Sequence, residues 1–162
     1  KVLDAIGDEV MYCGVIGAGN SAKLAHNCAS FSLRLMLAEV ISMGVKAGVE
    51  PAALWHGIEP KTAVEIILAS GGRNLFMEKF MPNIIHGKLA SGFALGLLHK
   101  DVRLACQLGA DSGVPVRFGN LAQEIYQTSI DDMGPGVQVN SVALTMDRLA
   151  GTHVVPEDYK GD

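Results

Sequence analysis

The chain has 162 residues, of which 49% are hydrophobic and 19% charged, and its formal net charge is −4. That length suits a single domain with a full core. The mild negative charge argues against nucleic-acid or membrane-surface partners, which select basic patches. Arg34, Glu39 and Lys46 interrupt the longest apolar stretches, so we expect no transmembrane helix. The apolar excess instead indicates a large core together with a buried interface.

The three cysteines, Cys13, Cys28 and Cys106, lie far apart and have no C-x-x-C spacing. We therefore expect buried, reduced thiols and a cytosolic or mitochondrial-matrix compartment. No histidine has ligand spacing with a cysteine or a pair of carboxylates, so no metal site is expected. No signal peptide is recognisable. The chain starts at Lys1 in what looks like the middle of a fold, and we expect it to be a piece of a longer protein.

One long helix is predicted to dominate the first half of the chain. Residues 1–7 suggest the end of a helix, and residues 8–14 suggest a short strand. From Ser21 a long stretch has no proline or glycine, and the expected end of the helix is at Gly48. Apolar residues spaced by four and three form one face: Leu24, Cys28, Phe31, Leu35 and Ala38. Much of the opposite face is also apolar, so this helix should be buried on several sides.

The remainder of the chain is also predicted to be helical. The expected helices are residues 51–58, 62–70, 93–113, 116–134 and 139–151. Residues 74–92 should be irregular, because proline and glycine break the pattern there. The core-facing residues expected in 93–113 are Leu97, Val102, Ala105 and Leu108. The tail from residue 152 onward is expected to be mobile. These patterns predict one all-α domain with a short strand at its start.

The stretch Gly17-Ala18-Gly19-Asn20-Ser21-Ala22 fits the G-x-G-x-x-G/A pattern of a dinucleotide-phosphate loop. A strand is expected before it and a helix after it, and Glu39 has the offset of a ribose-binding acid. That acid should follow a second strand, yet nothing ends the helix before Glu39. A phosphate loop is therefore disfavoured, and with it an autonomous nucleotide-binding domain.

Lys23 offers a second interpretation of the same segment. It follows Asn20 or Ser21 as the expected cap of the long helix and shares a face with His26 and Asn27. The positive end of the helix dipole and partial burial disfavour a protonated amine there. Such a lysine can give and take a proton near neutral pH. From spacing alone, a solvated lysine beside an ordinary cap is the simpler explanation.

Two blocks of the sequence carry a family resemblance. The segment GVIGAGNSAKLAHN at 14–27 fits the pattern G-x-x-G-x-G-x-x-x-K-x-x-x-N, and MPNIIHGKLASGFALGLLHKDVRLACQLGADSGVPV at 81–116 has a phenylalanine followed by lysine-aspartate and then LA. Both blocks resemble signatures of the β-hydroxyacid dehydrogenases, the 3-hydroxyisobutyrate dehydrogenase family. The resemblance covers nearly the whole chain. It implies the family's C-terminal helical domain, with a fold like the C-terminal domain of 6-phosphogluconate dehydrogenase, built around one long buried helix.

The resemblance also implies a division of the chain. Residues 1–16 would be a remnant of an upstream Rossmann domain, residues 17–155 the catalytic and dimerisation domain, and residues 156–162 a mobile tail. The implied protein is a cytoplasmic enzyme, or a matrix enzyme in a eukaryote, that forms a homodimer or homotetramer through the long helix. It would bind NAD or NADP mainly through the upstream domain, and the isolated chain would be inactive.

The resemblance further implies roles for five residues. Lys23 matches the general acid/base that moves the proton of the substrate oxygen during hydride transfer. Asn27 matches a substrate-binding asparagine, and Gly19 matches the glycine that leaves room at the helix start. Phe93 and Lys100 match residues that line the cofactor. The implied substrate is a small 3-hydroxy acid, and which one stays open.

Plainer alternatives accompany these roles. Lys100 could belong to a solvated helix face, Phe93 could be core, and Asp101 could be an exposed charge or a partner outside the site, so Asp101 is left out of it. The segment 137–140 has no acidic residue where the family often carries one, which leaves the contacts of the last helix open. The alternative function is a non-catalytic helical oligomerisation domain that keeps an idle lysine.

Overall fold

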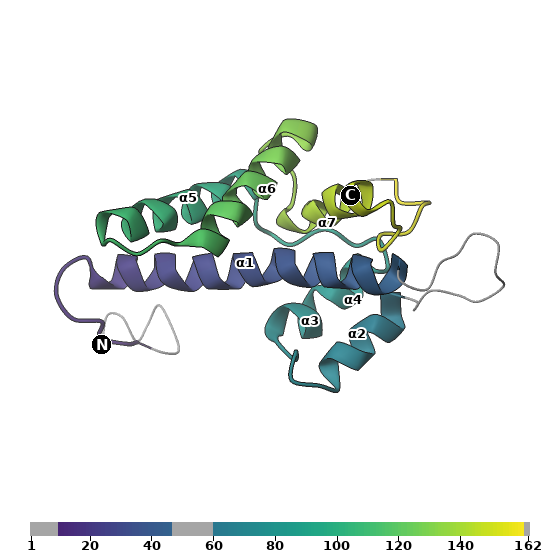
Figure 1. Ribbon diagram of the computed structural model, residues 1–162, viewed down its shortest axis with the longest axis horizontal. Helices are drawn as coiled ribbons and strands as arrows, with labels where there is room; N and C mark the ends of the chain where they lie inside the picture. The colour runs from purple at the N-terminus through teal and green to yellow at the C-terminus, as the bar shows by residue number, and fades with distance from the viewer. Residues whose placement is uncertain (1–9, 47–59, 161–162) are drawn as a thin grey trace.

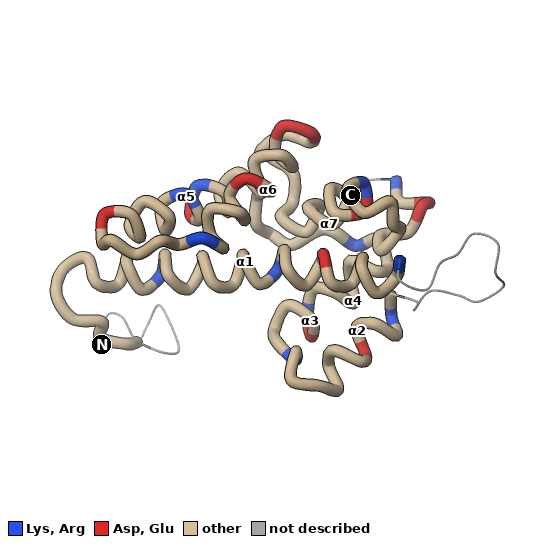
Figure 2. The backbone as a smooth tube through the Cα atoms, in the orientation of Figure 1, with Lys and Arg blue, Asp and Glu red and all other residues tan. Residues whose placement is uncertain are grey.

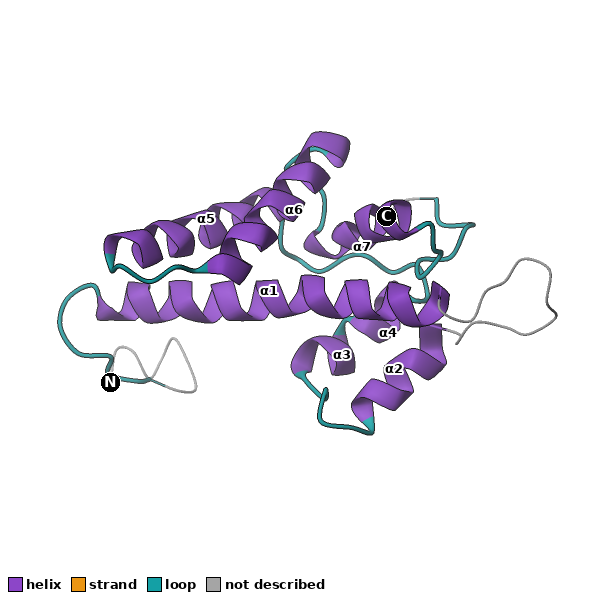
Figure 3. Ribbon diagram, viewed as in Figure 1, coloured by secondary structure: helices purple, strands orange, loops and turns teal. Residues whose placement is uncertain are grey.

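A computed structural model describes residues 10–46 and 60–160 (Figure 1). The helices are α1 (Ala18–Lys46), α2 (Pro60–Leu68), α3 (Leu75–Lys79), α4 (Met81–Ile84), α5 (Leu95–Asp111), α6 (Arg117–Met133), the 3-10 turn η2 (Val139–Ser141) and α7 (Val142–Ala150). Within those two ranges every regular element is helical (Figure 3). The all-α prediction is therefore confirmed.

Helix α1 is the axis of the fold. It runs along the length of the molecule, with α5, α6 and α7 on one side and α2, α3 and α4 on the other (Figure 1). Contacts join α1 to α2, α5, α6 and α7. The prediction of a long helix buried on several sides is confirmed for its second half, where Leu35, Leu37 and Ile41 are all buried. Glu39 lies inside α1, as the argument against a phosphate loop requires.

Two hydrophobic clusters flank this axis. The first joins α1 to α5, α6 and the η2 turn, and its fully buried members include Leu98, Val102 and Tyr126. The second joins the end of α1 to α2, α3, α4 and the segment after α7, and includes Ile41 and Met77. The second cluster also takes in Ala143 of α7, so it joins elements from both sides of α1 to the second half of the long helix.

Helix α1 is also long and apolar enough, by length and composition alone, to cross a membrane. It carries only four charged residues: Lys23, Arg34, Glu39 and Lys46 (Figure 2). The core helix of a soluble protein has the same properties. Arg34, in the middle of α1, is buried with its guanidinium group over the rings of Phe76 and Phe80, and its guanidinium carbon lies 4.8 Å from each ring centroid. Helix α1 packs against four other helices, and 39% of its most apolar stretch is buried inside the domain.

Several sequence predictions need correction. Residues 10–14 form no strand, because a strand needs a neighbour to pair with and the described ranges contain no sheet. Helix α1 begins at Ala18, so Asn20 and Ser21 lie in its first turns and are not its cap. Leu97 is exposed, and Leu98 one position along is buried instead. Cys13 is an exposed free thiol, although Cys28 is buried as expected. The helices expected at 1–7 and 51–58 lie outside the described residues.

The start of the C-terminal tail is also packed more firmly than predicted. Gly151, in the left-handed conformation with φ 62°, ends α7, and Val154 and Val155 beyond it are buried. The Asp147 carboxylate accepts hydrogen bonds from the Thr152 hydroxyl (2.8 Å) and from the backbone N–H groups of Val154 (2.8 Å) and Val155 (2.9 Å). A buried carboxylate with three donors fixes residues 152–155 to the domain.

Candidate active site

The site is built at the start of α1, where the helix leaves the glycine-rich segment. Gly17 has φ 95°, a left-handed conformation that favours glycine and turns the chain into the helix. Gly19 lies in the first turn, and a Cβ atom built there would meet no atom within 4 Å. No described part of the chain fills this space, and the role implied for Gly19 stays a prediction. The side chains of Lys23 and Asn27, one helical turn apart, project from the same face of α1.

Asp101 of α5 joins the predicted site residues. One of its oxygens, Oδ2, accepts hydrogen bonds from Lys23 Nζ at 2.9 Å and from Asn27 Nδ2 at 2.8 Å. Its other oxygen, Oδ1, lies 3.2 Å from Lys100 Nζ. The structure therefore brings together Lys23, Asn27 and Lys100, three of the five residues named from the sequence, around a carboxylate that sequence reasoning left out.

The carboxylate at the centre of this cluster is buried, whereas the two amines are exposed. The Asp101 side chain is 4% exposed, whereas Lys23 and Lys100 are 59% and 52% exposed. The partial burial expected for Lys23 is therefore not found. Burial tends to raise the pKa of the Asp101 carboxyl, but hydrogen bonds from its three neighbours outweigh that effect and lower its pKa overall. Asp101 is an ionised, fixed anchor, and the two amines above it face outward.

A signal for Asp101 was present in the sequence. It follows Lys100 directly in the block HKDVRLA, and successive residues of a helix point in directions about 100° apart. If the Lys100 side chain lies at the edge of α5, the Asp101 side chain points either toward α1 or toward solvent. Only the packing of α5 against α1 decides between these, and that packing places Asp101 under Lys23.

Phe93 lies two residues before α5 and makes contacts that are separate from those of the Lys23–Asp101 cluster. Its ring is partly buried and stacks on Phe31 of α1, with centroids 5.9 Å apart and planes inclined by 21°. The segment before it is held by Gln138, whose Oε1 accepts hydrogen bonds from the Ser91 and Gly92 backbone N–H groups, both at 2.9 Å. Phe93 thus packs at the edge of the hydrophobic core and remains partly exposed to solvent.

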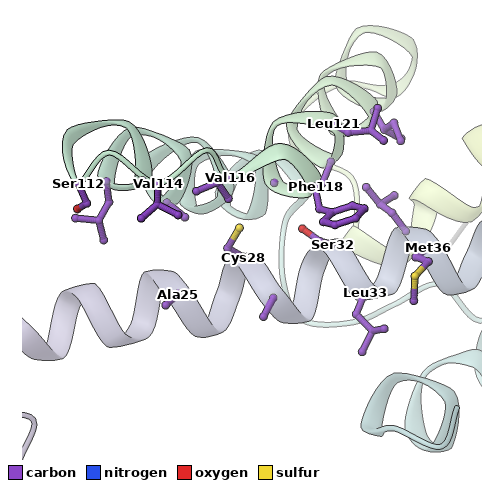
Figure 4. Close-up of a pocket in the computed structure, with 18 of the residues that line it drawn as sticks. Ala25, Cys28, Ser32, Leu33, Met36, Ser112, Val114, Val116, Phe118 and Leu121 are labelled. Carbon is purple, nitrogen blue, oxygen red and sulfur yellow. The ribbon is translucent and has the colours of Figure 1, made fainter. Parts of the chain in front are cut away.

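An apolar groove of about 770 Å³ lies between α1, the end of α5 and the start of α6 (Figure 4). Cys28, Ser32 and Met36 of α1 line one wall, and Val114, Val116 and Phe118 line the other. Cys28 and Asn27 are adjacent in α1 and so point to different faces. The groove is therefore a feature separate from the Lys23–Asp101 cluster. Among the described residues no three His, Cys, Asp or Glu side chains are grouped as metal ligands.

Comparison with known families decides the identity of this arrangement. Residues 17–145 match the model of the NAD-binding domain of NADP-dependent 3-hydroxyisobutyrate dehydrogenase. The chain belongs to this family. The matched range includes the glycine segment, Lys23, Asn27 and the whole of α5, so the resemblance drawn from the two sequence blocks is confirmed. Membership also supports NAD(P) as the cofactor.

The individual relatives of the chain are named as hydroxyacid dehydrogenases. The chain is 35% identical over 155 residues to 2-(hydroxymethyl)glutarate dehydrogenase of Eubacterium barkeri, covering 94% of this chain and 48% of that protein. It is 29% identical over 134 residues to the mitochondrial 3-hydroxyisobutyrate dehydrogenase of Mus musculus, covering 78% of this chain and 37% of the relative. The chain thus spans half or less of the length of these relatives.

A solved structure of the same family shares the fold. The 3-hydroxyisobutyrate dehydrogenase of Mycobacterium tuberculosis, solved with L-serine, superimposes with a TM-score of 0.72 at 22% identity. The match covers 90% of this chain and 49% of that one. The helical arrangement around α1 is therefore the fold of one part of that enzyme.

Proposed function

We propose that this chain is the C-terminal catalytic and dimerisation domain of an NAD(P)-dependent 3-hydroxyacid dehydrogenase. The observation that carries the proposal is the cluster in which Asp101 holds Lys23 and Asn27 on one face at the start of α1. An exposed amine, an amide and open space at Gly19 together suit a small hydroxy acid. The names of the relatives, a 2-(hydroxymethyl)glutarate and several 3-hydroxyisobutyrate dehydrogenases, support the substrate class.

NAD(P), when bound, supplies the acceptor or donor of the hydride. Phe93, whose ring is partly buried, and Lys100, whose side chain is 52% exposed, would line the bound cofactor in this proposal. Residues 1–16 then belong to an upstream dinucleotide-binding domain, residues 17–155 to this domain and residues 156–162 to its tail. With half of the cofactor site elsewhere, the isolated chain is expected to be inactive.

Lys23 moves the proton in this proposal. Its Nζ donates to the substrate carbonyl oxygen during reduction and accepts the hydroxyl proton during oxidation. Asp101 holds the amine in position from below, and the Asn27 amide, fixed by the same carboxylate, is placed to hydrogen-bond the substrate. Because both side chains share one oxygen of Asp101, their positions are set together, which favours a fixed orientation of the substrate relative to the amine.

The long helix is also proposed as the oligomer interface. Met36 and Met43 on α1 are 51% and 62% exposed, and Val40 lies between them on the same face. The apolar groove beside them adds Phe118 and Leu121, two further exposed side chains (Figure 4). Apolar surface of this extent favours burial against another subunit. We propose a homodimer or homotetramer in the cytoplasm, or in the mitochondrial matrix of a eukaryote.

The test is a substrate panel. The protein carrying this chain together with its dinucleotide-binding half is mixed with NAD+ or NADP+ and a series of 3-hydroxy acids, and NAD(P)H formation is followed by absorbance. Turnover of one or more of these acids is expected. No turnover of any of them would favour the alternative, a non-catalytic oligomerisation domain with an idle lysine. Micromolar binding of NAD by the isolated chain would instead indicate an autonomous nucleotide-binding domain.

A further inference from the structure

Gln138, which precedes the η2 turn, makes an unusual set of contacts with the loop before Phe93. Its Oε1 accepts from the backbone N–H of Ser91 at 2.9 Å, from the backbone N–H of Gly92 at 2.9 Å, and lies 3.1 Å from the Ser91 hydroxyl. Three donor groups of Ser91 and Gly92 therefore surround the side-chain oxygen of Gln138, which lies 47 and 46 positions further along the chain. Neither N–H group belongs to a helix, so Gln138 is what satisfies them.

The loop needs such an anchor because its backbone is turned sharply. Gly92 has φ 70°, the left-handed region, and directly precedes Phe93. Without the hydrogen bonds that Ser91 and Gly92 donate to Gln138 Oε1, these two residues would be free to sample other conformations, and the backbone that leads into Phe93 would move with them. The Ser91 hydroxyl has one hydrogen, which it can donate either to Gln138 Oε1 at 3.1 Å or to the Phe93 carbonyl oxygen at 3.2 Å.

The start of α5 is attached to the segment 137–139 by backbone hydrogen bonds, which do not involve the Gln138 side chain. The N–H of Val139 donates to the Phe93 carbonyl at 2.9 Å, and the N–H of Leu95 donates to the Val137 carbonyl at 2.8 Å. These bonds attach the start of α5 to the segment 137–139 without any side chain. The Gln138 side chain therefore acts on Ser91 and Gly92, not on the attachment of the helix.

We propose that Gln138 is a positioning residue that holds Phe93 in place to line the NAD(P) site. This inference rests on the proposed function, and specifically on the cofactor role of Phe93. It predicts that the acceptor oxygen at position 138 affects cofactor binding more than turnover, because Phe93 contacts the cofactor and Lys23 moves the proton.

The experiment compares variants of the protein that carries both halves. Gln138→Met removes the acceptor at similar size, Gln138→Glu keeps it, and Gln127→Met makes the same exchange at an exposed position on α6. NADH or NADPH binding is measured by fluorescence titration. We expect about tenfold weaker binding for Gln138→Met, with kcat within about threefold of wild type. Gln138→Glu and Gln127→Met should bind within about threefold of wild type.

A double variant tests whether Gln138 acts through Phe93. In the Phe93→Ala background, Gln138→Met should weaken cofactor binding by less than about twofold further. Amide hydrogen exchange at Ser91 and Gly92 should be faster in Gln138→Met and unchanged in Gln138→Glu. If Gln138→Met does not fold, Ser91→Ala, which removes one of the three donors, should still weaken binding by about threefold.

Other outcomes overturn the proposal. Wild-type binding by Gln138→Met, or by Ser91→Ala where that variant is needed, would show that the contact does not matter to the cofactor site. Additive losses in the double variant would show that Gln138 does not act through Phe93. A wild-type protein that binds neither NADH nor NADPH would overturn the proposed function and this inference with it, an outcome distinguishable from the other two.

Discussion

At the scale of single residues, Asp101 is the centre of the site. One buried carboxylate orients an amine and an amide from α1 and receives a second amine from its own helix. Removing any outer member leaves the others attached, whereas removing Asp101 releases them all. The carboxylate therefore couples the geometry of the site to the packing of α5 on α1.

Asp101→Asn should change the dependence of stability on pH. Because the folded pKa of Asp101 is lowered, its carboxylate stabilises the fold above the unfolded pKa of about 4, and this contribution is lost as pH falls through the folded pKa. We expect the variant to lose about 1 kcal/mol of unfolding free energy at neutral pH, since two of the partners are exposed. In strong acid the difference should shrink toward zero. Urea denaturation at several pH values measures this, and an equal loss at every pH would contradict it.

At the scale of elements, the segment after α7 is fixed to the domain by Asp147. Asp147→Ala leaves two buried backbone N–H groups, those of Val154 and Val155, without an acceptor, and we expect a loss of about 2–3 kcal/mol of unfolding free energy. Asp147→Asn, which keeps one oxygen, should lose less. Thermal unfolding measures both. Asp158→Ala, an exposed carboxylate nearby, is the matched control, and an Asp147→Ala variant as stable as this control would refute the role.

The helices themselves were largely predictable from the sequence. Breakers such as Gly134 and Gly151 end α6 and α7 where predicted, because a glycine in a positive-φ conformation ends a helix at little cost. The predicted face of α1 is likewise buried at Leu35 and Ala38. The prediction named Leu97 as buried, whereas Leu98 is the buried residue. Near the end of a helix, the buried face depends on the elements that pack against it, and the periodicity of the sequence does not describe these.

The site was predictable only in part. Lys23 and Asn27 lie on one face of one helix, so their spacing alone places them together. Asp101 comes from a helix 74 and 78 positions further along the chain, and only the packing of α5 on α1 brings it to them. The same limit applies to Gln138, whose contacts with Ser91 and Gly92 span 46 or 47 positions. For Gln138 no local pattern in the sequence indicates such a contact, and for Asp101 the signal is limited to its place next to Lys100 in the block HKDVRLA.

At the scale of the whole molecule, the exposed apolar side of α1 predicts self-association. Met36→Glu would place a charge on that face, and burying an unpaired charge in an interface is costly. We expect the wild-type protein to sediment as a dimer or tetramer and the variant to dissociate with an affinity at least about tenfold weaker. Lys61→Glu, exposed on α2, is the control. A monomeric wild type, or a variant that associates as tightly, would contradict the proposed interface.

The role of Lys23 as the residue that moves the proton of the substrate oxygen is tested most directly by kcat for Lys23→Ala in the protein that carries both halves. The loss of a positioned acid/base should lower kcat at least about 100-fold while the fold and cofactor binding are retained. Gln127→Met, away from the site, should match wild type. Equal kcat values for Lys23→Ala and wild type would show that Lys23 does not move the proton of the substrate oxygen.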